Sequence, residues 1–316
     1  MTPLAAVEFP PEVEETHRRA RRLEWITLAY VATAAASLYL TMGSSRAMKA
    51  SFYDDAISFV PAASFLIGTA VARRKPSPTY PYGTHRATSI AHLVAAVSLC
   101  AMGLFLLVEA GLTVFGGEKP TIGGMSLFDA VIWAGWPMLA ALAYSSIPTV
   151  ILGRMKAKLA PKLHDKVLHA DADMMKADWM AAAATAIGVI GVGFGVWWLD
   201  PLAAALVSVD ILKDGGDNLA TAVADLIDRR PKKVDQSDWE RLPDEVRGLL
   251  MRMDWVEAAE VRMREAGHVL VGDALVVPRP GTEDLVAKLA RAAEEAKALD
   301  WRVHEMAMLP VERLPD

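Results

Sequence analysis

Six long apolar runs within the first 229 residues most restrict the folds open to this chain of 316 residues. A helix that crosses a bilayer needs about 20 mainly apolar residues, and each run is of that order. Short segments rich in charge separate the runs. We therefore expect an all-α bundle of six transmembrane helices, at about 25–42, 52–72, 90–115, 128–152, 174–199 and 201–226.

The composition excludes several classes of protein. Hydrophobic residues make up 53% of the chain, more than is typical of a wholly soluble domain. Cys100 is the single cysteine, which excludes a disulfide framework and a cysteine-rich zinc module. The net charge of −5 argues against a nucleic-acid-binding protein, because such a protein needs a basic face.

Lysine and arginine are concentrated in every second connection between the runs, and such an excess marks the cytoplasmic side. The basic set comprises Arg18, Arg19, Arg21, Arg22, Arg73, Arg74, Lys75, Arg86, Arg154, Lys156, Lys158, Lys162, Lys166, Arg229, Arg230, Lys232 and Lys233. The opposite set comprises Arg46, Lys49 and Lys119. We therefore expect an integral membrane protein with both termini in the cytoplasm, in a plasma or inner membrane if the source is bacterial.

A change of composition near residue 229 predicts a second, soluble part. We expect a cytoplasmic tail at 1–23, a transmembrane domain at 24–229 and a cytoplasmic domain at 230–316. In the last, the spacing of apolar residues predicts helix, strand, strand, helix and strand, at about 238–253, 256–264, 268–277, 282–298 and 301–309. This order describes a small α+β domain. The sequence contains no glycine-rich phosphate loop, nucleophile elbow or HExxH motif, so we do not expect an enzyme.

Acidic residues inside two of the runs predict a cation site. A charge in the hydrocarbon region costs about 2.5 kcal/mol or more, so it persists mainly where it faces an ion, a partner or water. Asp54 and Ser58 share one helix face, and Met174 and Asp178 share another. Two such pairs facing each other would surround a divalent ion with carboxylate, hydroxyl and thioether groups. Alternatively, the acids cap or hydrate helix ends, and Asp210 either lines a water path or bonds a neighbouring helix.

Several motifs in a fixed order carry a family resemblance. They are Tyr80-Pro81-Tyr82-Gly83-Thr84-His85-Arg86 after the second run, Leu168-His169-Ala170-Asp171-Ala172 and Asp178 in the fifth, Asp200-Pro201 before the sixth, and Leu226-Ile227-Asp228 after it. In their order and spacing the chain resembles the cation diffusion facilitators, a family of metal exporters, over nearly its whole length. The resemblance implies six membrane helices, a cytoplasmic ferredoxin-like αββαβ domain and a homodimer.

The resemblance also implies a ligand set. The family carries a His or Asp and a second Asp four residues later on helix two, and a His and an Asp at the same spacing on helix five. The matched positions here are Asp54, Ser58, Met174 and Asp178, with Asp55 and Asp173 as substitutes. An oxygen-rich set favours manganese or iron, whereas zinc prefers nitrogen and sulfur, so manganese, iron and zinc are the candidate metals. The ligands of the two helices can lie at the same depth in the membrane only if helix two starts near Ser45 and helix five starts before Met174.

These features together predict efflux of a divalent metal ion in exchange for protons. A proton on Asp54 or Asp178 would release the metal, because ligands bind when deprotonated. We also expect Arg86 and Asp228 to join the membrane and soluble parts in a charge cluster, against the alternative of a plain solvent-exposed pair. The alternative function is a membrane-anchored regulatory or interaction protein with a degenerate metal site. A membrane hydrolase is a weaker alternative, because no activated nucleophile is recognisable near the acids.

Overall fold

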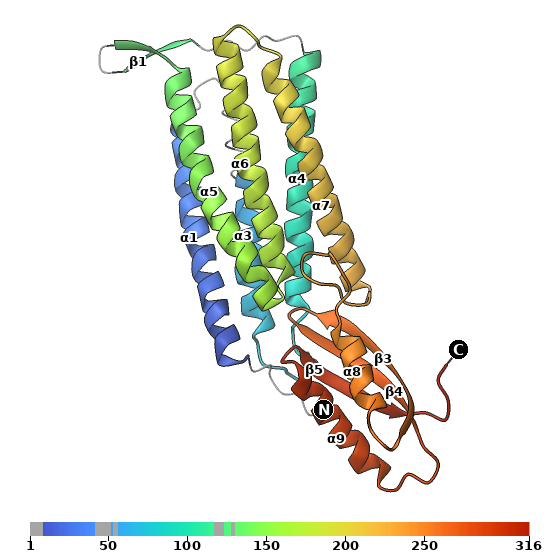
Figure 1. Ribbon diagram of the computed structural model, residues 1–316. Coiled ribbons are helices and arrows are strands. Elements are labelled where there is room, and N and C mark those ends of the chain that lie inside the picture. Colours follow the sequence, from blue (N-terminus) through green and yellow to red (C-terminus); the bar gives the residue numbers. More distant parts are fainter. Residues whose placement is uncertain (1–8, 42–51, 53–55, 117–122, 128–129, 316) are drawn as a thin grey trace.

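The structure, a computed structural model, has a bundle of long helices with a small α+β part at one end (Figure 1). It describes residues 1–316 except 1–8, 42–51, 53–55, 117–122, 128–129 and 316. The described bundle contains α1 (Pro11–Thr41), α3 (Phe59–Ala72), α4 (Ala87–Phe115), α5 (Gly135–Leu163), α6 (Lys166–Gly193) and α7 (Leu199–Leu226). α4 packs against α3 and α7, α6 against α5 and α7, and α1 against α3 and α5.

Four helices in the described part of the chain are long and apolar enough to cross a bilayer, namely α1, α4, α5 and α6. α3 is apolar, but its described length is 14 residues, shorter than a full span. α7 has 28 residues, but charged residues in its middle lower its mean hydropathy. The prediction of membrane-spanning helices is therefore confirmed, by length and composition, for α1, α4, α5 and α6.

The starts of α1 and α6 lie earlier in the chain than the apolar runs indicated. α1 begins at Pro11, and Ala20 on its first turns is fully buried against Phe65 and Ala160. α6 begins at Lys166, eight residues before Met174. This agrees with the prediction that helix five starts before Met174, which was needed for the ligands of both helices to lie at the same depth in the membrane. The expected early start of the second span falls at 42–51, outside the described residues.

The predicted span at 128–152 is wrong at its first residues. The chain forms β1 (Gly124–Leu127) and β2 (Ala130–Trp133), an antiparallel pair, and α5 starts at Gly135. Branched and aromatic side chains in β2 favour a strand. The Trp133 indole also packs closely on two glycines, Gly135 and Gly193, where a Cβ would approach the ring within 2.9 Å. The hairpin lies at the end of the bundle away from the small sheet (Figure 1).

The C-terminal part has the predicted order of helix, strand, strand, helix and strand. Its elements are α8 (Leu242–Met251), β3 (Val256–Ala266), β4 (Val269–Pro278), α9 (Leu285–Leu299) and β5 (Val303–Pro310). β4 is the central strand, antiparallel to β3 and parallel to β5. The apolar face of α8 packs on this sheet through Val246 and Leu250, both fully buried. The turn predicted between the two strands is made by Gly267, whose φ of 71° favours glycine.

Candidate functional site

Two predicted site residues meet inside the bundle. Ser58, the residue before α3, is 1% exposed, and Asp178 of α6 is 7% exposed. The Ser58 Oγ donates a hydrogen bond to the Asp178 Oδ1 at 2.5 Å. Asp178 lies 12 residues into α6, roughly 18 Å along its axis. The contact therefore places a carboxylate and a hydroxyl together near the middle of a membrane-type helix.

Met174 lies one turn before Asp178 and is fully buried. It belongs to an apolar cluster that contains Leu99 and Met102 of α4 and Ile211 of α7. Its side chain therefore packs among apolar side chains of α4 and α7. The cluster also includes Ile57, the neighbour of Ser58, so Met174 remains close to the Ser58 segment. The other two matched or substitute positions on that segment, Asp54 and Asp55, lie outside the described residues.

Asp173 takes part in a different set of contacts. Its Oδ2 accepts a hydrogen bond from the Asn218 Nδ2 of α7 at 3.0 Å and lies 3.9 Å from the His169 Nε2. Asn218 in turn contacts His92 of α4. In the structure as described, Asp173 thus faces α7 rather than Ser58. Nothing in the sequence pattern indicated Asn218, since a single amide carries no spacing signal.

Asp210 bonds a neighbouring helix, one of the two roles considered for it. Its carboxylate contacts the Lys176 Nζ at 3.1 Å, and Asp214 contacts the same ammonium at 2.8 Å. Lys176 and Asp210 remain nearly half exposed on the bundle surface. The three side chains form a charged patch across α6 and α7.

A buried ion cluster joins three helices and was missed by the sequence analysis. The Lys156 Nζ of α5 donates to the Glu24 Oε2 of α1 at 2.8 Å and to the Asp171 Oδ2 of α6. All three side chains are 0% exposed. The expectation that Lys156 lies in a basic connection is wrong, because α5 continues to Leu163. Only the fold brings a glutamate from α1 and an aspartate from α6 to this lysine.

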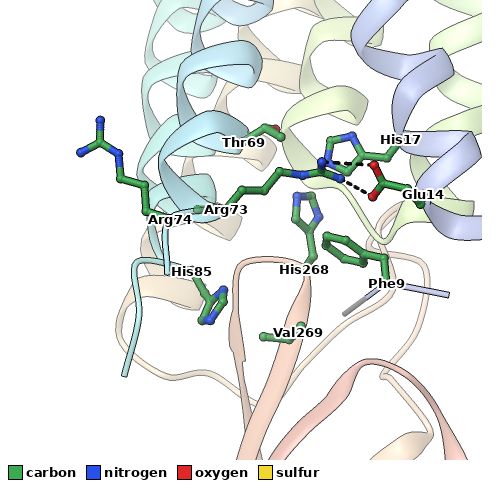
Figure 2. Close-up of a pocket in the computed structure, with 10 residues that line it drawn as sticks. Phe9, Glu14, His17, Thr69, Arg73, Arg74, His85, His268 and Val269 are labelled. Atoms are coloured by element: carbon green, nitrogen blue, oxygen red, sulfur yellow. Dashed lines mark hydrogen bonds and ion pairs between the residues drawn. The ribbon is translucent and has the colours of Figure 1, made fainter. Parts of the chain in front are cut away.

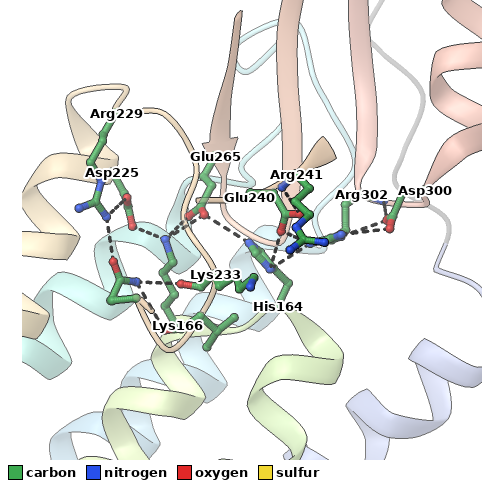
Figure 3. Close-up of polar contacts among 12 residues, drawn as sticks. His164, Lys166, Asp225, Arg229, Lys233, Glu240, Arg241, Glu265, Asp300 and Arg302 are labelled. Carbon is green, nitrogen blue, oxygen red and sulfur yellow. Dashed lines mark hydrogen bonds and ion pairs between the residues drawn. The ribbon is translucent and has the colours of Figure 1, made fainter. Parts of the chain in front are cut away.

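A second network joins the bundle to the sheet domain (Figure 3). The Lys166 Nζ at the start of α6 donates to Asp225 of α7 at 2.7 Å and to both oxygens of Glu265 of β3. The Arg302 guanidinium can only donate, so the His164 Nδ1 accepts from it at 3.2 Å. The His164 Nε2 then donates to Glu265 at 3.3 Å.

The electrostatics of this network favour the charged form of Glu265. Burial alone would raise its pKa, but the hydrogen bond from His164 and the charge of Lys166 lower the pKa to about 2. Glu265 therefore stays ionised at neutral pH. Its attachment to Lys166 fixes the end of β3 to the first turn of α6.

Arg86 and Asp228 form an ion pair beside this network. Arg86 lies at the start of α4, and Asp228 lies two residues after the end of α7. Arg264 of β3 also contacts Asp228, at 3.1 Å. These side chains are 42–51% exposed, so the three residues form an exposed cluster between the two parts of the chain.

Metal-ligating residues do not gather elsewhere in the described structure. Across the ranges it describes, no group of three or more His, Cys, Asp or Glu side chains could hold one metal ion. Among the predicted ligands in the part of the chain that the structure describes, Ser58 and Asp178 are in direct contact. A cation there would need further ligands, because one carboxylate and one hydroxyl do not fill the coordination shell of a divalent ion.

Comparison with known proteins identifies relatives of the whole bundle. Residues 25–227 match the family of cation efflux transmembrane domains. The manganese efflux system protein MneS of Bacillus subtilis is 25% identical over 275 residues, covering 85% of this chain and 87% of the relative. The manganese efflux system protein MneP of the same organism is 26% identical over 236 residues, 72% of each chain. The uncharacterized transporter YdbO, also from that organism, is 26% identical over 63% of this chain and 65% of its own length.

Proposed function

This chain belongs to the cation diffusion facilitator family, and from that premise we propose that it exports a divalent metal cation in exchange for protons. It is an integral membrane protein of a family that moves metal cations. The observation that carries the proposal is the buried contact between Ser58 and Asp178 at mid-bundle. An ionisable group in such a place is expected to serve an ion pathway.

The proposal includes six spans with both termini in the cytoplasm. α3 and α7 would complete the set of six. Lys158 and Lys162 on the last turns of α5 are among the basic residues that would mark the cytoplasmic side. The small sheet domain would then lie in the cytoplasm, next to the start of α6 and the end of α7.

The chemistry proposed for the site follows from its two side chains. The Asp178 carboxylate is a hard oxygen ligand. The Ser58 hydroxyl oxygen can offer a lone pair to a cation even while its hydrogen is donated to Asp178. Protonation of Asp178 removes its charge and weakens its hold on the cation. Alternating exposure of this site to the two sides would couple proton entry to metal release. Asp54, in the undescribed segment, is the proposed second carboxylate.

Manganese is the first metal to test. Both named efflux relatives are manganese efflux proteins, and oxygen ligands suit manganese. The contact between Ser58 and Asp178 contributes oxygen atoms alone, which supports this choice over zinc. Iron and zinc are the comparison ions.

A homodimer is part of the proposal. Lys213 and Asp217 in the middle of α7 are exposed on the single chain, close to the charged patch of Lys176, Asp210 and Asp214. Charges at this depth are costly against lipid. A second copy packed on α7, or a water-filled space between two copies, would remove that cost. Light scattering of the purified chain in detergent should give the mass of two chains.

Transport by proteoliposomes tests the function directly. With an acidic interior, manganese should enter the liposomes while an internal dye reports the loss of protons. Asp178→Asn should abolish manganese entry, since its amide still accepts from Ser58 but carries no charge. Asp254→Asn, a change at an exposed acid outside the bundle, should transport as the unchanged protein does. The proposal is refuted if the protein transports neither manganese nor iron nor zinc, or if Asp178→Asn transports manganese at the full rate.

A further inference from the structure

A cavity of about 280 Å³ lies where the bundle meets the sheet domain, apart from the Ser58 and Asp178 contact. Figure 2 shows side chains from four parts of the chain gathered around it. His17 comes from the first turns of α1, Thr69 and Arg73 from the end of α3, and His268 from the turn between β3 and β4. His85, in the connection before α4, completes the group.

Several polar atoms at this cavity lack hydrogen-bond partners within the described residues. They are the His17 Nε2, the Thr69 Oγ1, the His85 Nε2 and the His268 Nε2. His17 is 3% exposed and Thr69 is 4% exposed. The nearest acidic atom to His268 is the Asp165 Oδ2, at 3.6 Å, beyond hydrogen-bond distance. Buried polar groups are nearly always paired, so this concentration points to an absent ligand.

The charge around the cavity indicates the sign of that ligand. Glu14 is the one acid among the described lining residues, and Arg73 binds both of its oxygens, at 2.6 and 3.2 Å. The Arg73 guanidinium has five N–H donors, more than Glu14 uses. Burial, and then the neighbouring imidazoles of His304 and His268, lower the pKa of His85. Arg73 thus supplies positive charge at the cavity, and the histidine rings can supply N–H donors, an arrangement that suits an anion.

We propose that this cavity binds a phosphate group, either free in solution or on a lipid headgroup. A tetrahedral phosphate offers several acceptor oxygens, enough to take N–H bonds from His17, His268 and Arg73 and an O–H bond from Thr69. A metal cation fits less well, because the Arg73 guanidinium repels it. The described residues also provide no set of three metal ligands. A phosphate here would tie α1 and α3 to the sheet domain.

Calorimetry on the full chain in lipid-free detergent tests the proposal. Inorganic phosphate, added at constant ionic strength against chloride, should bind saturably. His17→Phe keeps a ring but removes the nitrogens, and Thr69→Val keeps the shape but removes the hydroxyl. Each should weaken phosphate binding about tenfold to hundredfold, the loss expected for one hydrogen bond to a charged group. Thr185→Val, a matched change on α6 remote from the cavity, should bind phosphate as the unchanged chain does.

Nanodiscs distinguish the two sources of phosphate. If a lipid headgroup occupies the cavity, phosphate binding should disappear in discs that contain phosphatidic acid and persist in discs of phosphatidylcholine alone. If the free anion is the ligand, binding should persist in both. The proposal is overturned if the unchanged chain shows no saturable binding in detergent, or if His17→Phe and Thr69→Val bind phosphate as tightly as the unchanged chain.

Discussion

Replacement of Lys156 by methionine should strongly destabilise the bundle. The ammonium is the shared partner of Glu24 and Asp171, and all three side chains are 0% exposed. Lys156→Met keeps most of the side-chain length but leaves two buried carboxylates facing each other. Removal of one partner from a buried ion pair costs about 3–5 kcal/mol, because the remaining charge is desolvated and unpaired.

This free-energy loss can be converted to a melting temperature. For a domain of 150–250 residues, about 1 kcal/mol lowers the Tm by roughly 2–4 °C. Lys156→Met should therefore melt about 6–20 °C below the unchanged chain. The single cysteine offers a native reporter, because Cys100 of α4 packs against Gly215 of α7. A thiol-reactive dye should label it as the bundle unfolds during heating in detergent.

Two further variants make the reasoning refutable. Lys158→Met removes an exposed ammonium two residues along the same helix, and its effect should stay within about 0.5 kcal/mol. Glu24→Gln and Asp171→Asn, added to Lys156→Met, should restore most of the loss, since a neutral buried cluster needs no counter-charge. If Lys156→Met and Lys158→Met have the same melting temperature, the ion cluster does not stabilise the packing of α1, α5 and α6 as the structure indicates.

Three other changes test the junction between the two parts. Gly267→Ala should destabilise the chain by more than about 1 kcal/mol in the same dye assay, because φ is 71° and a Cβ would lie 2.4 Å from the His85 carbonyl oxygen. The ionised Glu265 stabilises the fold above its ordinary pKa of 4.5, and this contribution should be lost as pH falls from 4.5 towards about 2. Melting curves across that range should show a smaller pH dependence for Glu265→Gln, and an unchanged dependence would contradict the assignment. Asp228→Asn should cost under about 1 kcal/mol, since its arginine partners are exposed, and high salt should remove the difference.

The amino-acid sequence by itself determined the long helices of the bundle and the order of helices and strands in the C-terminal domain. Apolar residues at helical spacing and an alternating hairpin pattern are local properties, so the order of elements in the C-terminal domain agrees with the structure. The error at 130–133 has a local reason too, because the branched and aromatic residues of this apolar segment also favour a strand. An apolar run alone does not distinguish these outcomes.

Pairing of polar side chains was decided by the tertiary structure. The i and i+4 spacing predicted that Ser58 and Asp178 face each other, and the structure brings these two into contact. The partners of Asp173 and Asp210 came from the fold alone. The sequence could not indicate that Lys156 is buried, because a lysine near basic neighbours has the pattern of a cytoplasmic connection. Its burial requires carboxylates from α1 and α6, which are distant in the chain. Charge compensation inside a bundle depends on such distant partners, whereas helix formation depends on near ones.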